Sequence, residues 1–336
     1  MNKKTKILVC GAGSIGQRHI QNLKSLNVDV SAWRSRRDLV EELSQQYRIV
    51  VNSSIDKALS RVDGVVVATS TSEHIKIALK AAKLGKAIFI EKPVSSSLDE
   101  LKPLLKEVTD KNLIIEIGFQ LRAHPNLIKL IEIIKQDKFG PLYTYRAVVG
   151  QRLDTWRPGT DYRNSYSASK DQGGGALLDL IHEIDLIHWL TGSIGKVFAN
   201  MTNASDLEMS AEDLVNLILV NKNGSVGQIQ LDMLSPVYRR ELELVFRDAI
   251  FYWNDVTGIL EKRMSSKSLV IDKTPKIFNR NTLFLTHMKH FIRRINGEVL
   301  EPLCSLNEGV EVQKIAEAAR LSSKLNKTVE LKEFDL

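Results

Sequence analysis

Ile7–Gly16, with the sequence I-L-V-C-G-A-G-S-I-G, is the stretch that decides the fold of this 336-residue chain. A short apolar run, typical of a buried strand, leads into a glycine pattern, and an amphipathic segment follows at once. Gly11 allows a tight turn, Gly13 lets the backbone approach a pyrophosphate, and Gly16 lets a helix pack on the strand. The free N–H groups at the start of that helix attract an anion. The stretch therefore predicts a dinucleotide site formed by Gly11, Gly13, Ser14, Ile15 and Gly16.

Length and composition indicate two domains and exclude several classes of protein. The formal net charge is +7, from 47 basic and 40 acidic residues, and 43% of the residues are hydrophobic. The chain exceeds the usual size of one domain, and its composition is ordinary for a globular protein. The basic pairs are scattered and no nucleic-acid motif accompanies them, so we predict no nucleic-acid partner. No apolar run approaches the ~20 residues of a membrane helix. The two cysteines form no disulfide or metal pattern, which suits a cytoplasmic protein.

A basic segment, Arg34-Ser35-Arg36-Arg37, follows the expected second strand, Val28–Trp33. Dinucleotide folds that bind NAD usually carry an acidic residue here, which accepts hydrogen bonds from the ribose hydroxyls. Arginines and a serine at this position would instead pair with a 2′-phosphate. We therefore favour NADP over NAD as the cofactor. The alternative is that these arginines form a solvated start to the next helix.

Three further buried strands are expected at Val62–Ala68, Ala87–Ile90 and Asn112–Gly118, separated by helical patterns. This alternation is typical of a doubly wound parallel sheet, which binds its ligands at the carboxyl ends of the strands. The residues that follow those ends are therefore predicted to contact the cofactor. They are Thr69, Ser70, Thr71 and His74 after one strand, Glu91 and Lys92 after the next, and Gln120 after the last.

The pattern changes from about residue 122, where strand–helix alternation stops. A helix is expected over Asn126–Lys135, and Asn223-Gly224 predicts a hairpin between two later strands. The candidate strands are Leu142–Val149, Lys196–Met201, Leu214–Val220, Ser225–Met233 and Arg240–Phe246. We therefore expect an α/β parallel-sheet domain over 1–121 and an α+β domain with an open, largely antiparallel sheet over 122–336. The last helix, about 306–325, begins at a capping box and is expected to pack back toward the first domain.

Lys92 and His182 are the residues best suited to carry chemistry. Lys92 sits at a strand end beside a proline, where its ammonium could stabilise developing alkoxide charge; a surface lysine beside a turn is the alternative. After Gly173-Gly174-Gly175 the sequence reads as one helix in which Asp179, His182 and Asp185 are spaced by three, so neighbours can meet along one flank. A histidine beside a carboxylate is the usual general base, although a core histidine remains the alternative. No H-E-x-x-H motif is present, so we predict no metal.

A loop rich in aromatic residues and arginines precedes the three glycines. Trp156, Arg157, Tyr162 and Arg163 are its candidate substrate-binding residues. Aromatic faces beside guanidinium groups suit a sugar ring and a phosphate. An interface or an ordered surface loop is an equally good interpretation of the same composition.

The motifs resemble those of the glucose–fructose oxidoreductase / inositol dehydrogenase / MocA (Gfo/Idh/MocA) family. They are G-A-G-S-I-G, T-S-T-S-E-H, E-K-P, G-F-Q-L-R and G-G-G-A-L-L-D-x-x-H-x-x-D, and their order and spacing cover essentially the whole chain. The W-R-P, D-Y-R and Y-S-A segments are similar to the branch found with bacterial surface-polysaccharide and nonulosonic-acid pathways.

The resemblance implies a Rossmann domain and a C-terminal α/β domain whose open sheet mediates homodimers or homotetramers. It also implies NAD(P)-dependent oxidation or reduction of a hydroxyl on a sugar, cyclitol or nucleotide sugar. By this analogy Lys92 and His182 are catalytic, Asp179 is the family's aspartate and Arg122 contacts substrate. One departure is that Asp179 and His182 are three residues apart without a glycine, where the family usually has four with one. The alternatives are a glycosidase that uses transient oxidation and a non-catalytic sensor, and the intact Lys92 and His182 argue against the sensor.

Overall fold

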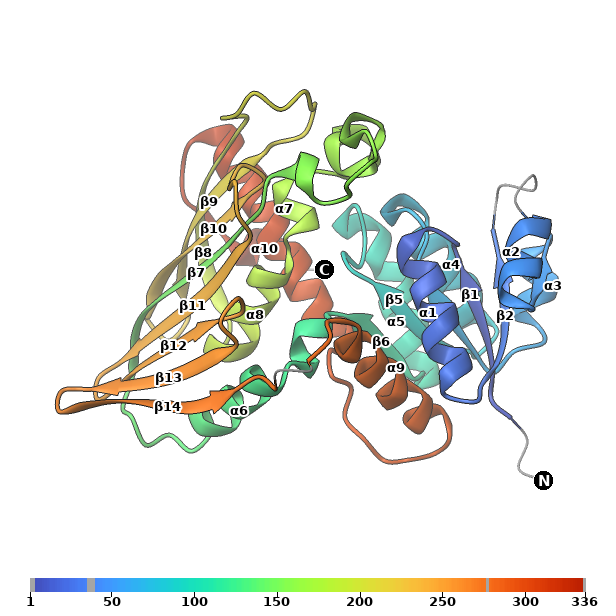
Figure 1. Cartoon of the computed structure of the whole chain (residues 1–336), viewed down its shortest axis with the longest axis horizontal. Coiled ribbons are helices and arrows are strands. Elements are labelled where there is room, and N and C mark those ends of the chain that lie inside the picture. The colour runs from blue at the N-terminus through green and yellow to red at the C-terminus, as the bar shows by residue number, and fades with distance from the viewer. Residues whose placement is uncertain (1–3, 35–39, 276–277, 335–336) are drawn as a thin grey trace. The chain divides into compact units, whose positions relative to one another are not determined.

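The glycine turn follows the first strand of a six-stranded parallel sheet, in a computed structural model that describes residues 4–34, 40–275 and 278–334 (Figure 1). The predicted cofactor residues Ser35, Arg36 and Arg37 lie outside the described residues. The chain forms two compact units. The first comprises Met1–Ala123 and Asn279–Val310, and the second comprises His124–Phe278 and Glu311–Leu336. The division differs from the expected one because Asn279–Val310 returns to the first unit.

The first unit is a doubly wound sheet with the strand order β3-β2-β1-β4-β5-β6, all neighbours parallel. Its strands are β1 (Lys6–Cys10), β2 (Asp29–Trp33), β3 (Val50–Asn52), β4 (Gly64–Val67), β5 (Ala87–Glu91) and β6 (Ile115–Gly118). Its helices are α1 (Ser14–Ser25), α2 (Val40–Tyr47), α3 (Ile55–Leu59), α4 (Thr71–Lys83), α5 (Leu101–Lys111) and α9 (Asn281–Ile295). The predicted parallel sheet is confirmed. The strand order reverses between β1 and β4, and such switch points bind ligands in open α/β sheets.

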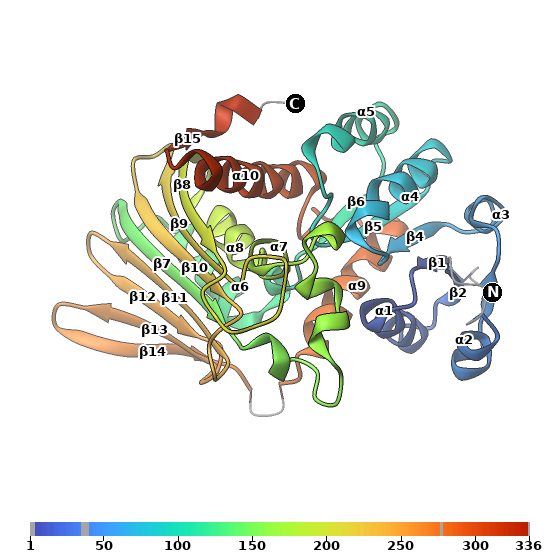
Figure 2. The same cartoon turned by 90° about the horizontal axis from the view of Figure 1, so that it is seen from above.

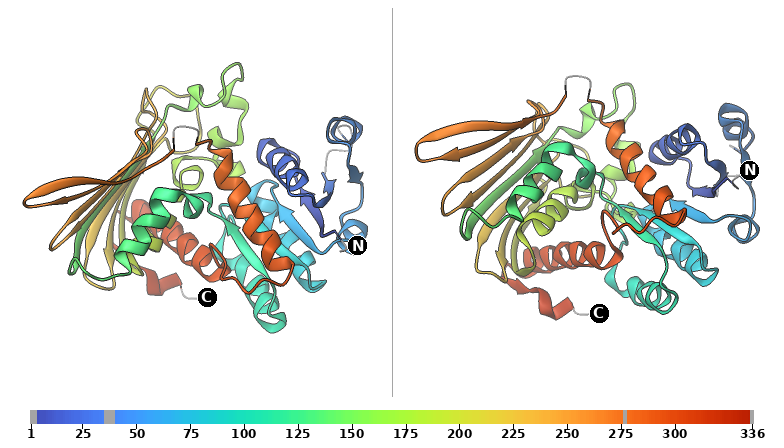
Figure 3. Two further views of the ribbon diagram at one scale, coloured as in Figure 1. Left: turned by 60° about the horizontal axis from the view of Figure 1, so that its bottom comes forward. Right: turned by 90° about the horizontal axis from the view of Figure 1, so that it is seen from below.

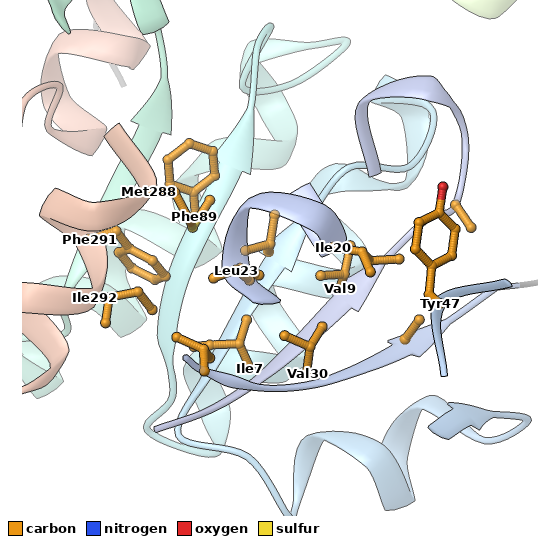
Figure 4. Packing of buried hydrophobic residues seen from close by; sticks show 14 of the residues in the cluster. Ile7, Val9, Ile20, Leu23, Val30, Tyr47, Phe89, Met288, Phe291 and Ile292 are labelled. Atoms are coloured by element: carbon orange, nitrogen blue, oxygen red, sulfur yellow. The ribbon is translucent and has the colours of Figure 1, made fainter. Parts of the chain in front are cut away.

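Helices α1 and α9 pack on the same side of this sheet around one apolar cluster. Leu23 of α1 and Phe291 of α9 are fully buried, together with Ile7 of β1 and Phe89 of β5 (Figure 4). Burying a side chain of this size contributes about 1.5–3 kcal/mol. This burial explains why α9, which follows the second unit in the chain, returns to complete the first.

The second unit contains a nine-stranded sheet with the order β14-β13-β12-β11-β7-β10-β9-β8-β15. Its strands are β7 (Leu142–Gly150), β8 (Ile194–Thr202), β9 (Leu214–Asn221), β10 (Val226–Asp232), β11 (Arg239–Phe246), β12 (Ile250–Asn254), β13 (Ile259–Met264), β14 (Lys267–Lys273) and β15 (Val329–Glu330). Every neighbouring pair is antiparallel except β7 and β10. The expected open, largely antiparallel sheet is confirmed, and Asn223-Gly224 joins β9 to β10 as predicted.

Helices of the second unit lie along one face of its sheet (Figures 2 and 3). They are α6 (Pro125–Ile134), α7 (Ala176–Asp179), α8 (His182–Thr191) and the greater part of α10 (Leu306–Leu325). The opposite face carries no helix in the described part of the chain. The capping box at the start of α10 forms as predicted, since the Ser305 N–H donates to Glu308 over 2.8 Å. None of the described helices combines the length and apolar character that crossing a membrane requires.

Candidate functional site

The glycine turn has the geometry of an anion cradle. Gly11 adopts φ +98°, and a Cβ there would lie 2.4 Å from the Ala68 carbonyl oxygen. A Cβ at Gly16 would lie 2.1 Å from the Gly11 carbonyl oxygen, so that glycine is needed for close packing. Gly13 differs because a Cβ there would meet nothing within 4 Å. It is the N-cap of α1, and no side-chain cap hydrogen bond forms there within the described residues. The turn thus combines open space with the N-terminal end of a helix, which suits a pyrophosphate.

The other predicted cofactor segments in the first unit follow the carboxyl ends of neighbouring parallel strands. The Gly11 N–H donates to the Trp33 carbonyl over 2.9 Å, which fixes the end of β2 beside the turn and places Arg34 directly after it. The Ala68 N–H donates to the Cys10 carbonyl over 2.8 Å, which fixes the start of the Thr69–Thr71 segment in the same way. The segments after β1, β2, β4, β5 and β6 therefore share one edge of the sheet.

Two buried side-chain oxygen atoms at this edge have no hydrogen-bond partner among the described residues. They are the Thr69 hydroxyl oxygen after β4 and the side-chain carbonyl oxygen of Gln120, which is 5% exposed, after β6. A buried polar group without a partner costs about 1–3 kcal/mol. Together with the open cradle at Gly13, these atoms fit a polar cofactor bound along the edge.

Lys92 follows β5 and is braced through its neighbours. The Glu91 carboxylate lies 2.6 Å from His19 Nε2 on α1, and it accepts a hydrogen bond from the Lys92 N–H over 3.3 Å. On the other side, His74 Nδ1 on α4 lies 2.9 Å from the Pro93 carbonyl oxygen. The segment that carries Lys92 is therefore tied to two helices, one of which begins at the glycine turn.

The charges around Glu91 favour its ionised form. Burial by itself would raise the pKa of Glu91, but the hydrogen bond and charge of His19, together with the charges of Lys92 and His74, hold that pKa below its usual range. Burial lowers the pKa of His74, and its hydrogen bonds to two carbonyl groups oppose that shift. The second of these carbonyls belongs to Thr69, 3.2 Å from Nε2. Glu91 and His74, both predicted to contact cofactor, are thus buried and engaged within the protein.

The single helix expected after the three glycines is interrupted in the second unit. α7 ends at Asp179 and α8 begins at His182, so the expected flank of Asp179, His182 and Asp185 on one helix does not form. The apolar run around these residues reads as continuous helix, but Leu180 adopts φ −101°, ψ 19°, which ends α7. Asp179, His182 and Asp185 are 8%, 4% and 0% exposed. The short spacing from Asp179 to His182 is therefore accommodated by a turn.

A tyrosine holds the Asp179 carboxylate. The Tyr166 hydroxyl donates to Asp179 Oδ1 over 2.6 Å. α8 is fixed separately, because the Arg240 Nε on β11 donates to Glu183, the residue next to His182, over 2.6 Å in a fully buried ion pair. Breaking such a buried pair costs about 3–5 kcal/mol. Both ends of the turn between α7 and α8 are therefore anchored within the second unit.

The candidate residues of the aromatic loop, residues 151–172, differ in their exposure and in their hydrogen-bond and ion-pair partners. Trp156 is half-buried and its indole N–H donates to the Gln151 carbonyl over 2.9 Å. The Tyr162 hydroxyl accepts from the Glu208 N–H over 3.0 Å. Arg163 pairs with Asp161, whereas Arg157 is exposed and has no carboxylate partner within the described ranges. Arg157 is therefore the arginine of this loop best placed to meet an anionic ligand.

Arg122, a predicted substrate contact, is buried in the first unit. Its guanidinium pairs with Glu308 and donates to the Leu303 carbonyl over 2.9 Å. The surroundings favour a role in holding the start of α10. Over the described residues, no group of three or more His, Cys, Asp and Glu side chains is arranged to hold a metal ion.

Two family models match most of the chain. The model for the oxidoreductase family with an NAD-binding Rossmann fold matches residues 5–119, and the Gfo/Idh/MocA C-terminal domain model matches residues 127–251. The chain belongs to the Gfo/Idh/MocA family.

Relatives of this Gfo/Idh/MocA protein span several substrates. It is 25% identical to an uncharacterized oxidoreductase of Bacillus subtilis over 96% of this chain and 95% of the relative. It is 28% identical to the myo-inositol 2-dehydrogenase of Thermotoga maritima over 67% of each chain. It is 27% identical to the UDP-N-acetylglucosamine 3-dehydrogenase of Acidithiobacillus ferrooxidans over 71% of each chain. The fold is that of a levoglucosan dehydrogenase solved in complex with NADH, with a TM-score of 0.86 at 19% identity over 98% of this chain and 99% of that one.

The structure of this Gfo/Idh/MocA protein adds two hydrogen bonds that the sequence did not predict. His19 and Tyr166 each hydrogen-bond the carboxylate of a candidate site residue, Glu91 and Asp179. The signal for His19 was its place on the buried face of α1 beside Ile20 and Leu23. Tyr166 belongs to the Y-S-A segment of the aromatic loop, but nothing in that segment indicated Asp179 as its partner, which lies across the glycine run.

Proposed function

We propose that this Gfo/Idh/MocA protein is an NADP-preferring dehydrogenase or reductase acting on a sugar, cyclitol or nucleotide sugar. The observation that carries the proposal is the open cradle at Gly13, at the sheet edge where Lys92 follows β5. The relatives that act on myo-inositol and on UDP-N-acetylglucosamine support the substrate class. The similarity of the aromatic loop to surface-polysaccharide enzymes favours a nucleotide sugar. A cytoplasmic location stays a prediction from the cysteine content.

The cofactor would be held by the first unit. Gly11, Gly13, Ser14, Ile15 and Gly16 would take the pyrophosphate. The segment from Arg34 to Arg37 would pair with the 2′-phosphate of NADP. A bound nicotinamide supplies the hydride acceptor in oxidation and the hydride donor in reduction.

The chain's own residues have two proposed tasks, which are to transfer one proton and to stabilise the negative charge that develops on the substrate oxygen. In oxidation, the His182 imidazole takes the hydroxyl proton, while the Lys92 ammonium donates a hydrogen bond to the alkoxide oxygen. The carbon–hydrogen bond breaks with its electron pair leaving as hydride, and a carbonyl forms. Asp179 keeps the histidine oriented and stabilises its charged form. In reduction, His182 returns the proton.

Substrate would be bound by the second unit. Trp156 and Tyr162 offer aromatic faces for a sugar ring, and Arg157 offers an unneutralised guanidinium for a phosphate. The engagement of Arg163 with Asp161 makes that arginine the weaker candidate. A nucleotide sugar carries both a ring and phosphates, which matches this combination.

Calorimetric titration of the purified protein with NADP and NAD, side by side, tests the cofactor assignment. NADP binding at least tenfold tighter than NAD, or about 1.4 kcal/mol, is the expected result. Equal affinities would contradict the NADP preference, and binding of neither would contradict the dehydrogenase. The loaded protein is then assayed with UDP-N-acetylglucosamine and myo-inositol by following reduced nicotinamide.

We also propose that the helix-free face of the nine-stranded sheet joins copies of this chain as a homodimer or homotetramer. A row of side chains crosses four strands of that face, namely Phe198, Ile218, Gln228 and Arg146. They line a shallow hollow of about 300 Å³, and Ile218 is 49% exposed. Exposed apolar side chains within a polar rim are typical of an interface.

Ile218→Lys places a charge at this face and is expected to shift the protein to monomer in analytical ultracentrifugation. Val50→Lys is the matched control, because Val50 is 67% exposed on β3 in the first unit. A wild-type monomer, or an oligomer that Ile218→Lys leaves intact, would contradict this interface.

A further inference from the structure

We propose that Tyr166 is a positioning residue that fixes the Asp179 carboxylate and so couples the aromatic loop to the proton-transfer group. The inference rests on the proposed function, since Asp179 matters here as the partner of His182. Tyr166 itself is not assigned a catalytic role, because it acts through Asp179.

The hydrogen bond has the geometry of a charge-assisted contact. The Tyr166 oxygen lies 2.6 Å from Asp179 Oδ1, within the range of about 2.5–2.7 Å typical of a hydroxyl bound to a carboxylate. Asp179 is 8% exposed, so little water competes for its oxygens. The Tyr166 residue is 41% exposed, because its ring lies on a surface loop while its hydroxyl turns inward. The carboxylate is thus held by a group that belongs to the loop.

The glycine run packs closely against the backbone of Tyr166. A Cβ at Gly174 would lie 2.1 Å from the Tyr166 carbonyl oxygen, so only glycine allows this approach. The Gly174 N–H donates to Ser169 over 2.9 Å, and the Gly175 N–H donates to Ser167 over 3.0 Å. Because the loop backbone is tied to the residues that begin α7, the tyrosine reaches Asp179 from a predetermined position.

The interrupted helix explains why Asp179 needs such a partner. In a continuous helix, residues three apart lie on neighbouring turns of one face, and each can orient the other. Here α7 ends at Asp179 and α8 begins at His182. The helix therefore does not fix the carboxylate relative to the imidazole. The Tyr166 hydroxyl supplies a fixed contact from outside the helix.

The electrostatics keep Tyr166 as a donor. Burial of its hydroxyl, followed by the charge and hydrogen bond of Asp179, raises the pKa of Tyr166 above its usual range. The positive charge of Arg157 opposes this shift. The phenol therefore stays protonated at neutral pH and keeps donating to the carboxylate. A ligand that draws the loop away from α7 would lengthen this hydrogen bond and weaken the hold on Asp179.

Kinetics of Tyr166→Phe test the positioning role, with Tyr238→Phe as the matched control. Tyr238 donates to Asp255 over 2.5 Å in the same unit and has no part in the proposed site. With NADP and UDP-N-acetylglucosamine or myo-inositol, kcat of Tyr166→Phe is expected to fall about 10- to 100-fold, as for loss of one hydrogen bond to a charged group. Its NADP affinity stays unchanged, and the pH profile of kcat shifts. Equal kcat and an identical pH profile in Tyr166→Phe and Tyr238→Phe would overturn the proposal.

Fluorine NMR of protein labelled with fluorotyrosine tests the bond without any substrate. The Tyr166 signal is assigned as the one that Tyr166→Phe removes. Its chemical shift at neutral pH is expected to change in Asp179→Asn, because the hydrogen bond to a charged carboxylate is lost. An unchanged chemical shift would show that the two groups do not interact and would overturn the proposal. Failure of the proposed function looks different, because the wild-type protein would then turn over neither substrate while the fluorine signal still responded to Asp179→Asn.

Discussion

The supports of Lys92 in the first unit and of Asp179 in the second differ in kind. Lys92 follows Glu91 and precedes Pro93, and these are held by His19 and His74, both buried on core helices. Asp179 is held by Tyr166 from a surface loop. The support on the proposed cofactor side thus comes from buried core helices, while the support on the proposed substrate side comes from a surface loop.

The largest effect is expected on the stability of the first unit. Glu116 on β6 is fully buried and contacts His287, His290 and Arg294 of α9, at 3.0, 2.9 and 3.0 Å. Removing its charge leaves the Arg294 guanidinium and two imidazoles without their carboxylate partner, so Glu116→Gln is expected to lower the free energy of unfolding by about 3–5 kcal/mol. Glu298→Gln is the control, since Glu298 belongs to an exposed pair with Arg293 and should cost at most about 1 kcal/mol. Urea denaturation measures both, and similar losses would contradict the account.

The same carboxylate predicts a pH dependence. Burial would raise the pKa of Glu116, but the hydrogen bonds and charges of His287 and His290 outweigh burial and lower it to about 2. Because the folded pKa lies below the ordinary value of 4.5, the stabilisation is complete above about pH 4.5 and is lost as the pH falls toward 2. Denaturation curves across that window should show a shallower acid dependence in Glu116→Gln than in the wild type. If the stability of Glu116→Gln and of the wild type changed equally with pH across that window, the lowered pKa of Glu116 would be contradicted.

The next prediction concerns the contact between His19 and Glu91, which supports the segment that carries Lys92. His19→Leu leaves Glu91 buried without its imidazole partner, which is expected to cost about 2–3 kcal/mol of stability. The freed carboxylate is then available to the Lys92 ammonium, so kcat should also fall. Gln21→Ala, an exposed change on the same helix, should leave both quantities unaltered. If His19→Leu were as stable and as active as Gln21→Ala, the contact between His19 and Glu91 would have no role in stability or catalysis.

Two glycines of the turn separate folding from cofactor binding. Gly16→Ala places a methyl group against the Gly11 carbonyl and should destabilise the first unit by about 1–3 kcal/mol. Gly13→Ala has open space and an ordinary φ of −72°, so stability should change by at most about 0.5 kcal/mol. The added methyl group there obstructs a phosphate, and NADP should bind at least about tenfold more weakly by calorimetry. Unchanged NADP affinity in Gly13→Ala would contradict the proposal that this turn binds the pyrophosphate.

The smallest effect concerns cofactor choice. Arg34→Ala should reduce the preference for NADP over NAD by about tenfold or less, near 1 kcal/mol, because other arginines of the segment remain. NAD affinity itself should not change, which makes NAD the internal control of the titration. Equal losses of affinity for NADP and NAD would indicate that Arg34 supports the end of β2 and does not bind the 2′-phosphate.

The sequence predicted features whose causes are local. The glycine turn, the hairpin at Asn223-Gly224 and the capping box at Ser305 each depend on a few adjacent residues, and the structure contains all three. The apolar run around Asp179 carries no glycine or proline that would signal a break, yet Leu180 leaves the helical conformation and ends α7 there. The return of α9 to the first unit, and the bonds from His19 and Tyr166, join residues distant in sequence. Such contacts leave no periodicity in one chain, so they could not be predicted.

The proposed roles of Lys92 and His182 are tested most directly by the rate of nicotinamide reduction in the wild type, Lys92→Ala and His182→Ala, each saturated with NADP as verified by calorimetry. We expect each variant still to bind NADP and turnover to fall by about 10²- to 10⁴-fold, the usual contribution of a positioned acid or base. Turnover unchanged in either variant would contradict the role given to that residue.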